Sequence, residues 1–242
     1  MSHWASRISA KPIQVTPAAH KHLSKRDPVM RRLIRKHGKC DLTPEKRRPP
    51  FQSLVLAVAH QQLNGTAANS ILTRFKKLFP DRKFPRPEDL AKVTDDQIRA
   101  CGFSAAKIKA IRDIAEKTLS GVVPDSRRIA ALSDDEIIAR LTEVRGVGRW
   151  TVEMLLIFQL GRPDVLPVDD FGVRTGFRLA YTKREMPKPK ELLAFGERWK
   201  PHRTTAAWFL WCAADAAKKV AATPRRRKSA ARRRSHNTAK KK

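Results

Sequence analysis

Two short stretches carry the residue types that could do chemistry. One is a glycine turn, Gly146-Val147-Gly148, and the other is a pair of acids, Asp169-Asp170, about twenty residues later. Glycine permits backbone conformations and close ligand approach that a side chain would block. The N–H groups of a helix that starts at such a turn can bind phosphate, assisted by the helix dipole. A carboxylate can stabilise a developing cation or orient an attacking water.

The phosphate contacts are expected from the backbone N–H groups of Gly146, Gly148 and Arg149, with a hydroxyl added by Thr151. A Gly-x-Gly turn is common between helices, so an ordinary turn is the simpler alternative for this segment. The two acids could likewise be mere caps of the next helix. The surrounding pattern favours the phosphate interpretation, because an amphipathic helix precedes the turn and an apolar helix follows it. The sequence therefore predicts a helical hairpin over about 137–160.

Capping boxes predict the helices that position this hairpin. Thr94 with Gln97 and Ser133 with Glu136 have the required spacing, and each box opens a short helix that leads to a glycine turn. The two blocks form a weak internal repeat of a helix–turn–helix unit. No run of alternating residues predicts a strand, so the fold class is all-α.

Other helices are predicted on both sides of these blocks. Residues 17–37 contain one or two helices with a start at Asp27-Pro28, and residues 51–79 contain a central apolar helix that is interrupted. The interruption is the polar cluster His60-Gln61-Gln62, which must face water, a polar element or a ligand. The alternative is that this cluster forms only a helix cap and a turn. A final apolar helix starts near Thr204.

The charge indicates a polyanionic partner. The chain has a formal net charge of +29, and twelve basic residues but no acids lie in 218–242, so residues 1–217 still carry +17. Lysine and arginine that neutralise phosphates gain affinity through counterion release, although a basic tail can also serve solubility alone. We expect an irregular lead-in over 1–16, a helical domain over 17–217, and a disordered basic tail over 218–242.

Several function classes are disfavoured by the sequence. No apolar run is long enough for a membrane span, and the N-terminus has no signal-peptide core. Three scattered cysteines, Cys40, Cys101 and Cys212, suit neither a disulfide framework nor a CxxC metal site, which favours a reducing cytosol.

The segment 141–177 resembles the helix–hairpin–helix, glycine/proline-rich loop and aspartate signature of the HhH-GPD superfamily of DNA glycosylases. The words Gly-Val-Gly-Arg-Trp-Thr and Leu-Pro-Val-Asp-Asp-Phe are similar in particular to the bacterial DNA-3-methyladenine glycosylase II branch. Further similar segments, AHQQLNGTAA, GFSAAKIKAIRDIA and RWKPHRTTAAWFLW, extend the resemblance over roughly 17–215. It implies two helical subdomains with the active-site cleft between them. It also implies a cytoplasmic monomer, nucleoid-associated if bacterial, that acts on double-stranded DNA containing a damaged base.

The resemblance assigns the catalytic role to Asp170, which immediately precedes the helix after the loop, and leaves Asp169 to cap that helix or to position its neighbour. Breaking an N-glycosidic bond gives the deoxyribose oxocarbenium character that a carboxylate can stabilise. Bifunctional relatives have a lysine nucleophile where this chain has Trp150. An indole cannot form a Schiff base, so a monofunctional enzyme is implied. Trp150 and Trp211 match pocket aromatics suited to cationic alkylated purines, the alternative for Trp211 being a core aromatic.

The resemblance also places Gln62, beside Gln61, at the position that fills the gap left by a flipped nucleotide. It implies a monovalent cation, Na⁺ or K⁺, held by the backbone carbonyls of Thr142, Val144 and Val147. No cofactor is required and no iron–sulfur cluster is expected. The implied function is excision of alkylated purines, such as 3-methyladenine and 7-methylguanine, that leaves an abasic site. The alternatives are a glycosylase for deaminated purines, etheno adducts or uracil, and a non-catalytic DNA-binding protein.

Overall fold

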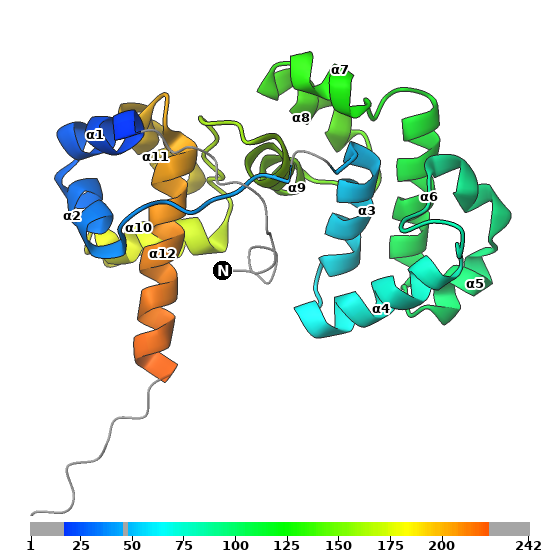
Figure 1. Ribbon diagram of the computed structural model, residues 1–242. Coiled ribbons are helices and arrows are strands. Elements are labelled where there is room, and N and C mark those ends of the chain that lie inside the picture. The colour runs from blue at the N-terminus through cyan, green and yellow to red at the C-terminus, as the bar shows by residue number, and fades with distance from the viewer. Residues whose placement is uncertain (1–16, 46–47, 223–242) are drawn as a thin grey trace, which may run out of the picture.

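A computed structural model describes residues 17–45 and 48–222, and within these ranges every regular element is a helix. Figure 1 shows two groups of helices on either side of α9. The first group contains α1 (Pro17–Arg26), α2 (Pro28–His37), α10 (Phe171–Ala180), α11 (Pro189–Gly196), η3 (Glu197–Trp199) and α12 (Arg203–Ala222). The second contains α3 (Pro50–His60), α4 (Gly65–Lys77), η1 (Pro87–Lys92), α5 (Asp95–Ala100), α6 (Ala105–Leu119), α7 (Ser126–Ala131) and α8 (Asp134–Thr142). The all-α fold with two helical subdomains is confirmed.

Local capping sets most helix starts. Asp27 accepts hydrogen bonds from the N–H groups of Val29 and Met30 at the start of α2. The capping boxes at Thr94 and Ser133 are both formed, and they open α5 and α8 as predicted. Side-chain oxygens at these positions satisfy N–H groups that have no partner within the helix.

The chain crosses twice from one group of helices to the other. Residues 38–45, which follow α2, extend toward the second group, and there the Glu45 N–H donates to the Phe158 carbonyl at 2.8 Å. The second passage runs through α9 (Arg149–Leu155), which continues as the π-helical turn η2 (Leu156–Leu160). Helix α9 packs against α3 and α8, so the predicted hairpin is formed by α8 and α9.

The last helix extends further than predicted. Helix α12 runs to Ala222, five residues into the segment that we expected to be a disordered tail from Lys218. Alanine and lysine are favourable in a helix, and Lys218 lies 4.0 Å from Asp215 one turn earlier. The predicted lead-in over 1–16 and the rest of the tail, 223–242, lie outside the described residues. No helix in the described ranges is long and apolar enough to cross a membrane.

Candidate active site

Asp170 lies where the two helix groups meet. Its Oδ1 accepts the Val173 N–H at 2.8 Å and the indole N–H of Trp211 at 2.7 Å. Its Oδ2 accepts the indole N–H of Trp150 at 2.8 Å. Three donors from α9, α10 and α12 therefore fix the carboxylate at the start of α10.

The structure corrects the expectation about which of the two acids caps the following helix. We expected Asp169 to cap the following helix or to position its neighbour, but Asp170 is itself the N-cap of α10, and Asp169 is exposed. The cap requires the residue immediately before the first helical residue, and only Asp170 can reach the Val173 N–H from there.

Two residues at the start of α12 anchor the loop before Asp170. Arg203 at the start of α12 pairs with Asp164, with Nε 2.9 Å from Oδ1. The Thr204 hydroxyl donates to the Arg162 carbonyl at 2.7 Å and accepts the Val165 N–H at 2.9 Å. These contacts tie the glycine/proline-rich loop to α12, the helix that also carries Trp211 and its bond to Asp170.

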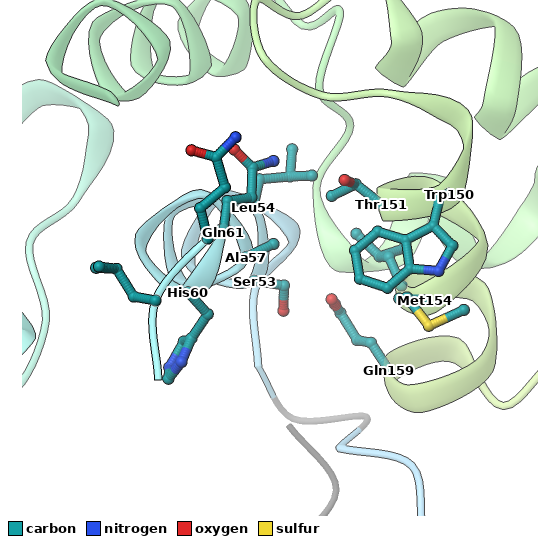
Figure 2. A pocket seen from close by; sticks show the side chains of 12 residues that line it. Ser53, Leu54, Ala57, His60, Gln61, Trp150, Thr151, Met154 and Gln159 are labelled. Carbon is teal, nitrogen blue, oxygen red and sulfur yellow. The ribbon is translucent and has the colours of Figure 1, made fainter. Parts of the chain in front are cut away.

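Beside Trp150, a cavity of about 450 Å³ opens between α3, α9 and η2. This volume lies within the range of small-molecule sites, which are mostly apolar with a few polar groups. Figure 2 shows the Trp150 indole as one wall of the cavity and the end of α3 as the facing wall. The lining residues are Ser53, Leu54, Ala57, His60, Gln61, Gln62, Leu63, Trp150, Thr151, Met154, Leu155 and Gln159.

Trp150 and Trp211 lie in different environments. Trp150 is 40% exposed and lines the cavity. Trp211 is buried, does not line this cavity, and stacks on Phe158 with ring centroids 5.7 Å apart. Its close approach to α10 depends on Gly172, where a Cβ would lie 2.8 Å from the Trp211 Cδ1. The structure thus gives Trp211 the task of orienting Asp170.

The loop after α3 contains the two candidate plug residues. Gln62 is exposed and has a φ of 57°, in the left-handed region that few side-chain-bearing residues adopt. The amide of Gln61 instead donates to the Gly146 carbonyl at 2.9 Å. Gln61 therefore ties the loop to the hairpin, whereas Gln62 is free to project from it.

Lys107 of α6 is a second anchor of this loop, and its role was not predicted. Its Nζ donates to the Ala59 carbonyl at 2.9 Å and to the Gln61 carbonyl at 2.7 Å. These are carbonyls at the C-terminal end of α3, where a cation is favourable. Burial lowers the pKa of Lys107.

The hairpin turn leaves the start of α9 accessible. Gly146 has a φ of 75°, and Gly148 is an N-cap without a side chain, so the first N–H groups of α9 lack a side-chain cap. Arg149 is also exposed, whereas Thr151 is buried in the cavity wall, away from the exposed turn. Three of the four predicted phosphate-binding residues thus lie together on the surface.

Two side chains of α6 hold the turn in place. The Lys117 Nζ donates to the Glu143 carbonyl at 2.6 Å, and Asp113 accepts the Arg145 N–H at 2.6 Å. The predicted cation ligands are carbonyls of this turn, and the Val144 carbonyl already accepts the Val147 N–H at 3.0 Å. A carbonyl oxygen has two lone pairs, so the donor set remains compatible with a cation. In the described ranges, no cluster of His, Cys, Asp and Glu side chains could hold a metal ion.

Glu153 is a buried carboxyl that the sequence analysis missed. Its Oε1 pairs with Arg149 Nε at 3.0 Å, while its Oε2 has no hydrogen-bond partner among the described residues. Burial raises its pKa from 4.5 to about 7, Arg149 opposes this shift, and Asp169 and Asp170 add to it. Because the folded pKa lies above the unfolded value, this group stabilises the fold less as the pH rises from about 4 through 7. An acid inside the apolar run of α9 was the signal that could have revealed it.

The family model for "HhH-GPD superfamily base excision DNA repair protein" matches residues 55–202. This chain belongs to the HhH-GPD superfamily. The matched range contains the α8–α9 hairpin, Trp150 and Asp170, whereas Trp211 lies beyond it.

Similar proteins of the superfamily carry one recurring name. DNA-3-methyladenine glycosylase 1 of Schizosaccharomyces pombe is 44% identical over 192 residues, which cover 78% of this chain and 84% of that protein. A structure of S. pombe Mag1 with abasic DNA superposes with a TM-score of 0.71 at 43% identity, covering 80% of this chain and 95% of that one. A DNA-3-methyladenine glycosidase from Bacillus halodurans gives 0.76 at 34% identity, covering 85% and 93%.

Proposed function

We propose that the protein is a monofunctional DNA glycosylase that hydrolyses alkylated purines from double-stranded DNA and leaves an abasic site. The observation that carries the proposal is Asp170 held by two indole N–H groups, one of them from Trp150, which lines a cavity of about 450 Å³. The names of the similar glycosylases and the abasic DNA bound to Mag1 support the same activity.

The target base must leave the DNA stack to enter the cavity. Alkylation at a purine ring nitrogen produces a cation, and the exposed Trp150 face attracts cations through its quadrupole. Cationic bases are also good leaving groups, because cleavage returns the bonding electrons to a positively charged ring. The cavity therefore needs to supply recognition more than acid catalysis.

Asp170 acts on the deoxyribose of the flipped nucleotide. As the N-glycosidic bond breaks, its electrons leave with the base and positive charge develops on the deoxyribose. The Asp170 carboxylate stabilises this charge and orients a water, whose oxygen bonds to the anomeric carbon while its proton is released. The indole donors hold the carboxylate in place, so little reorganisation is needed during the reaction.

Water is the nucleophile in this proposal. A lyase reaction needs an amine that forms a Schiff base, and the matching position holds Trp150. The proposed DNA contacts are the N–H groups at the start of α9 for a phosphate and Gln62 for the vacated space. A cation on the hairpin carbonyls would support the turn and takes no part in the chemical step.

The experiment that tests this function measures free bases by mass spectrometry after the protein acts on methylated duplex DNA. We expect release of 3-methyladenine and 7-methylguanine, and no covalent protein–DNA product when borohydride is added. Absence of base release would contradict the excision of alkylated purines and leave the two alternatives, a glycosylase for other lesions or a non-catalytic DNA-binding protein. A trapped adduct would contradict the monofunctional mechanism.

Lys107 provides a separate test of the plug. Replacement of Lys107 by methionine removes both bonds to the α3 carbonyls, so the Gln61–Gln62 loop should lose its fixed shape. Hydrogen bonds to charged groups are worth about 1.5–3 kcal/mol, so we expect excision from a fully paired duplex to slow by about tenfold. Excision of the same lesion opposite a mismatched base should slow less, because flipping is easier there. Single-turnover rates on the two duplexes measure the difference.

Two control variants separate loop positioning from general damage. Lys107→Arg keeps the charge and should recover part of the rate, and Lys109→Met removes an exposed charge from the same helix and should change neither rate. Equal slowing on both duplexes by Lys107→Met would contradict a role in base flipping.

A further inference from the structure

Two polar oxygens in the cavity wall have no hydrogen-bond partner among the described residues. They are the Ser53 hydroxyl of α3 and the Gln159 Oε1 of η2. Both side chains are deeply buried, at 3% and 4% exposure, and both residues line the cavity. Figure 2 shows the Gln159 oxygen and the Ser53 hydroxyl turned toward the same space between α3 and η2. Buried polar atoms are nearly always paired, so these two oxygens indicate a ligand.

The orientation of the Gln159 amide is determined by its other end. Its Nε2 donates to the Arg48 carbonyl at 2.7 Å. A carbonyl can only accept, so the NH₂ group must face Arg48 and the oxygen must face the cavity. The segment that carries Arg48 is itself fixed beside η2 by the bond from the Glu45 N–H to the Phe158 carbonyl.

The backbone of η2 also favours a binding role for Gln159. The residues 156–160 form a π-helical turn that ends at Gly161, which has a φ of 69°. The π turn is less stable than an α turn and is frequent at functional sites, because it shifts a side chain out of the regular helical register. Here the shifted turn places Gln159 on the same side of the cavity as Trp150, with its oxygen toward Ser53 of α3.

We propose that Gln159 Oε1 and the Ser53 hydroxyl accept the N–H groups of an exocyclic amino group on the extruded purine. The cavity would thus select alkylated adenine-type and guanine-type bases over etheno adducts, whose corresponding nitrogen is closed into a ring and has no N–H. This specificity rests on the proposed glycosylase function. A site built to bond an N–H discriminates against a base that lacks it, because the buried acceptors then remain unpaired.

The first test uses the wild-type protein. Release of 3-methyladenine from methylated DNA is compared with release of 1,N6-ethenoadenine from a duplex that contains a single adduct. Each single-turnover rate is divided by the spontaneous release rate of the same base. We expect the ratio to favour 3-methyladenine by about tenfold or more, as one unmet buried acceptor implies. Equal normalised rates would overturn the proposal, whereas no 3-methyladenine release at all would instead refute the proposed excision of alkylated purines.

The second test uses variants of the two acceptors. Gln159→Leu should slow 3-methyladenine release by about tenfold and leave ethenoadenine release unchanged or faster. Ser53→Ala should act in the same direction, and it decides the matter if the Gln159 variant fails to fold. Gln52→Leu, the same replacement on α3 away from this cavity, should alter neither rate. An equal loss on both bases would indicate cavity shape alone, and no loss would indicate that the two oxygens bind a trapped water; either result overturns the proposal.

Discussion

Replacement of Asp170 by asparagine is expected to reduce base release by about a hundredfold to a thousandfold. Asparagine has the same shape but no negative charge, so it cannot stabilise the cationic sugar, and removal of one electrostatic group from a preorganised site costs about 10²–10³ in rate. The amide NH₂ of the asparagine would also face one of the two indole N–H groups that now donate to Asp170, and two donors cannot form a hydrogen bond. Single-turnover release of 3-methyladenine from methylated DNA measures the loss.

The Asp170→Asn protein should still fold and still bind DNA. An asparagine oxygen can accept the Val173 N–H, so the N-cap of α10 is retained. The DNA contacts proposed for the hairpin and the plug loop involve other residues. Affinity for a duplex with an abasic site, and the thermal midpoint, check these two expectations.

Asp169→Asn is the matched control, because it neutralises the neighbouring exposed acid. We expect the rate of base release by this variant to stay within about threefold of the wild-type rate, because the charge it removes is exposed and screened by water. If Asp170→Asn kept a rate within a few fold of the wild type, the chemistry would have to lie with another carboxyl. Glu153 would then be the next candidate, although it is buried and paired with Arg149.

Replacement of Gly176 by alanine is expected to destabilise the protein by about 3 kcal/mol or more. A Cβ at Gly176 would lie 1.9 Å from the Leu210 carbonyl oxygen and 2.5 Å from its carbonyl carbon. Both atoms belong to the backbone of α12, so no side-chain rotation can relieve the overlap. The two helices must separate, and overpacking of this kind typically costs about 1–3 kcal/mol or more.

The same substitution should also impair catalysis. Asp170 caps helix α10 and Trp211 lies in α12, so a separation of the two helices lengthens the bond between these two side chains. Urea denaturation measures the stability, and single-turnover excision well below the melting temperature measures the activity of the folded fraction.

Gly148→Ala is the stability control for Gly176→Ala. A Cβ at Gly148 meets nothing within 4 Å, and its φ of −90° suits any residue. We expect its unfolding free energy to stay within about 1 kcal/mol of the wild type. A Gly176→Ala protein of equal stability would show that α10 and α12 can move apart at little cost.

Local chemistry determined the helices and the hairpin. Caps such as Asp27 and Ser133 act on N–H groups two or three residues away, so the sequence alone located their helices. The glycine turn at 146–148 and the loop to Asp170 form a continuous segment, and a resemblance over such a segment could assign their roles. The extent of α12 past Lys218 was missed because charge suggested disorder while helix propensity favoured continuation.

Only the tertiary structure decided which side chains meet. Trp211 reaches Asp170 across 41 positions, Lys107 reaches the Gln61 carbonyl across 46, and Gln159 reaches Arg48 across 111. Such contacts depend on how helices pack, which no local pattern specifies. The sequence by itself therefore determined the helices, the hairpin and the identity of the candidate aspartate. Packing between distant segments decided how that aspartate is oriented, how the plug loop is held, and which oxygens face the cavity.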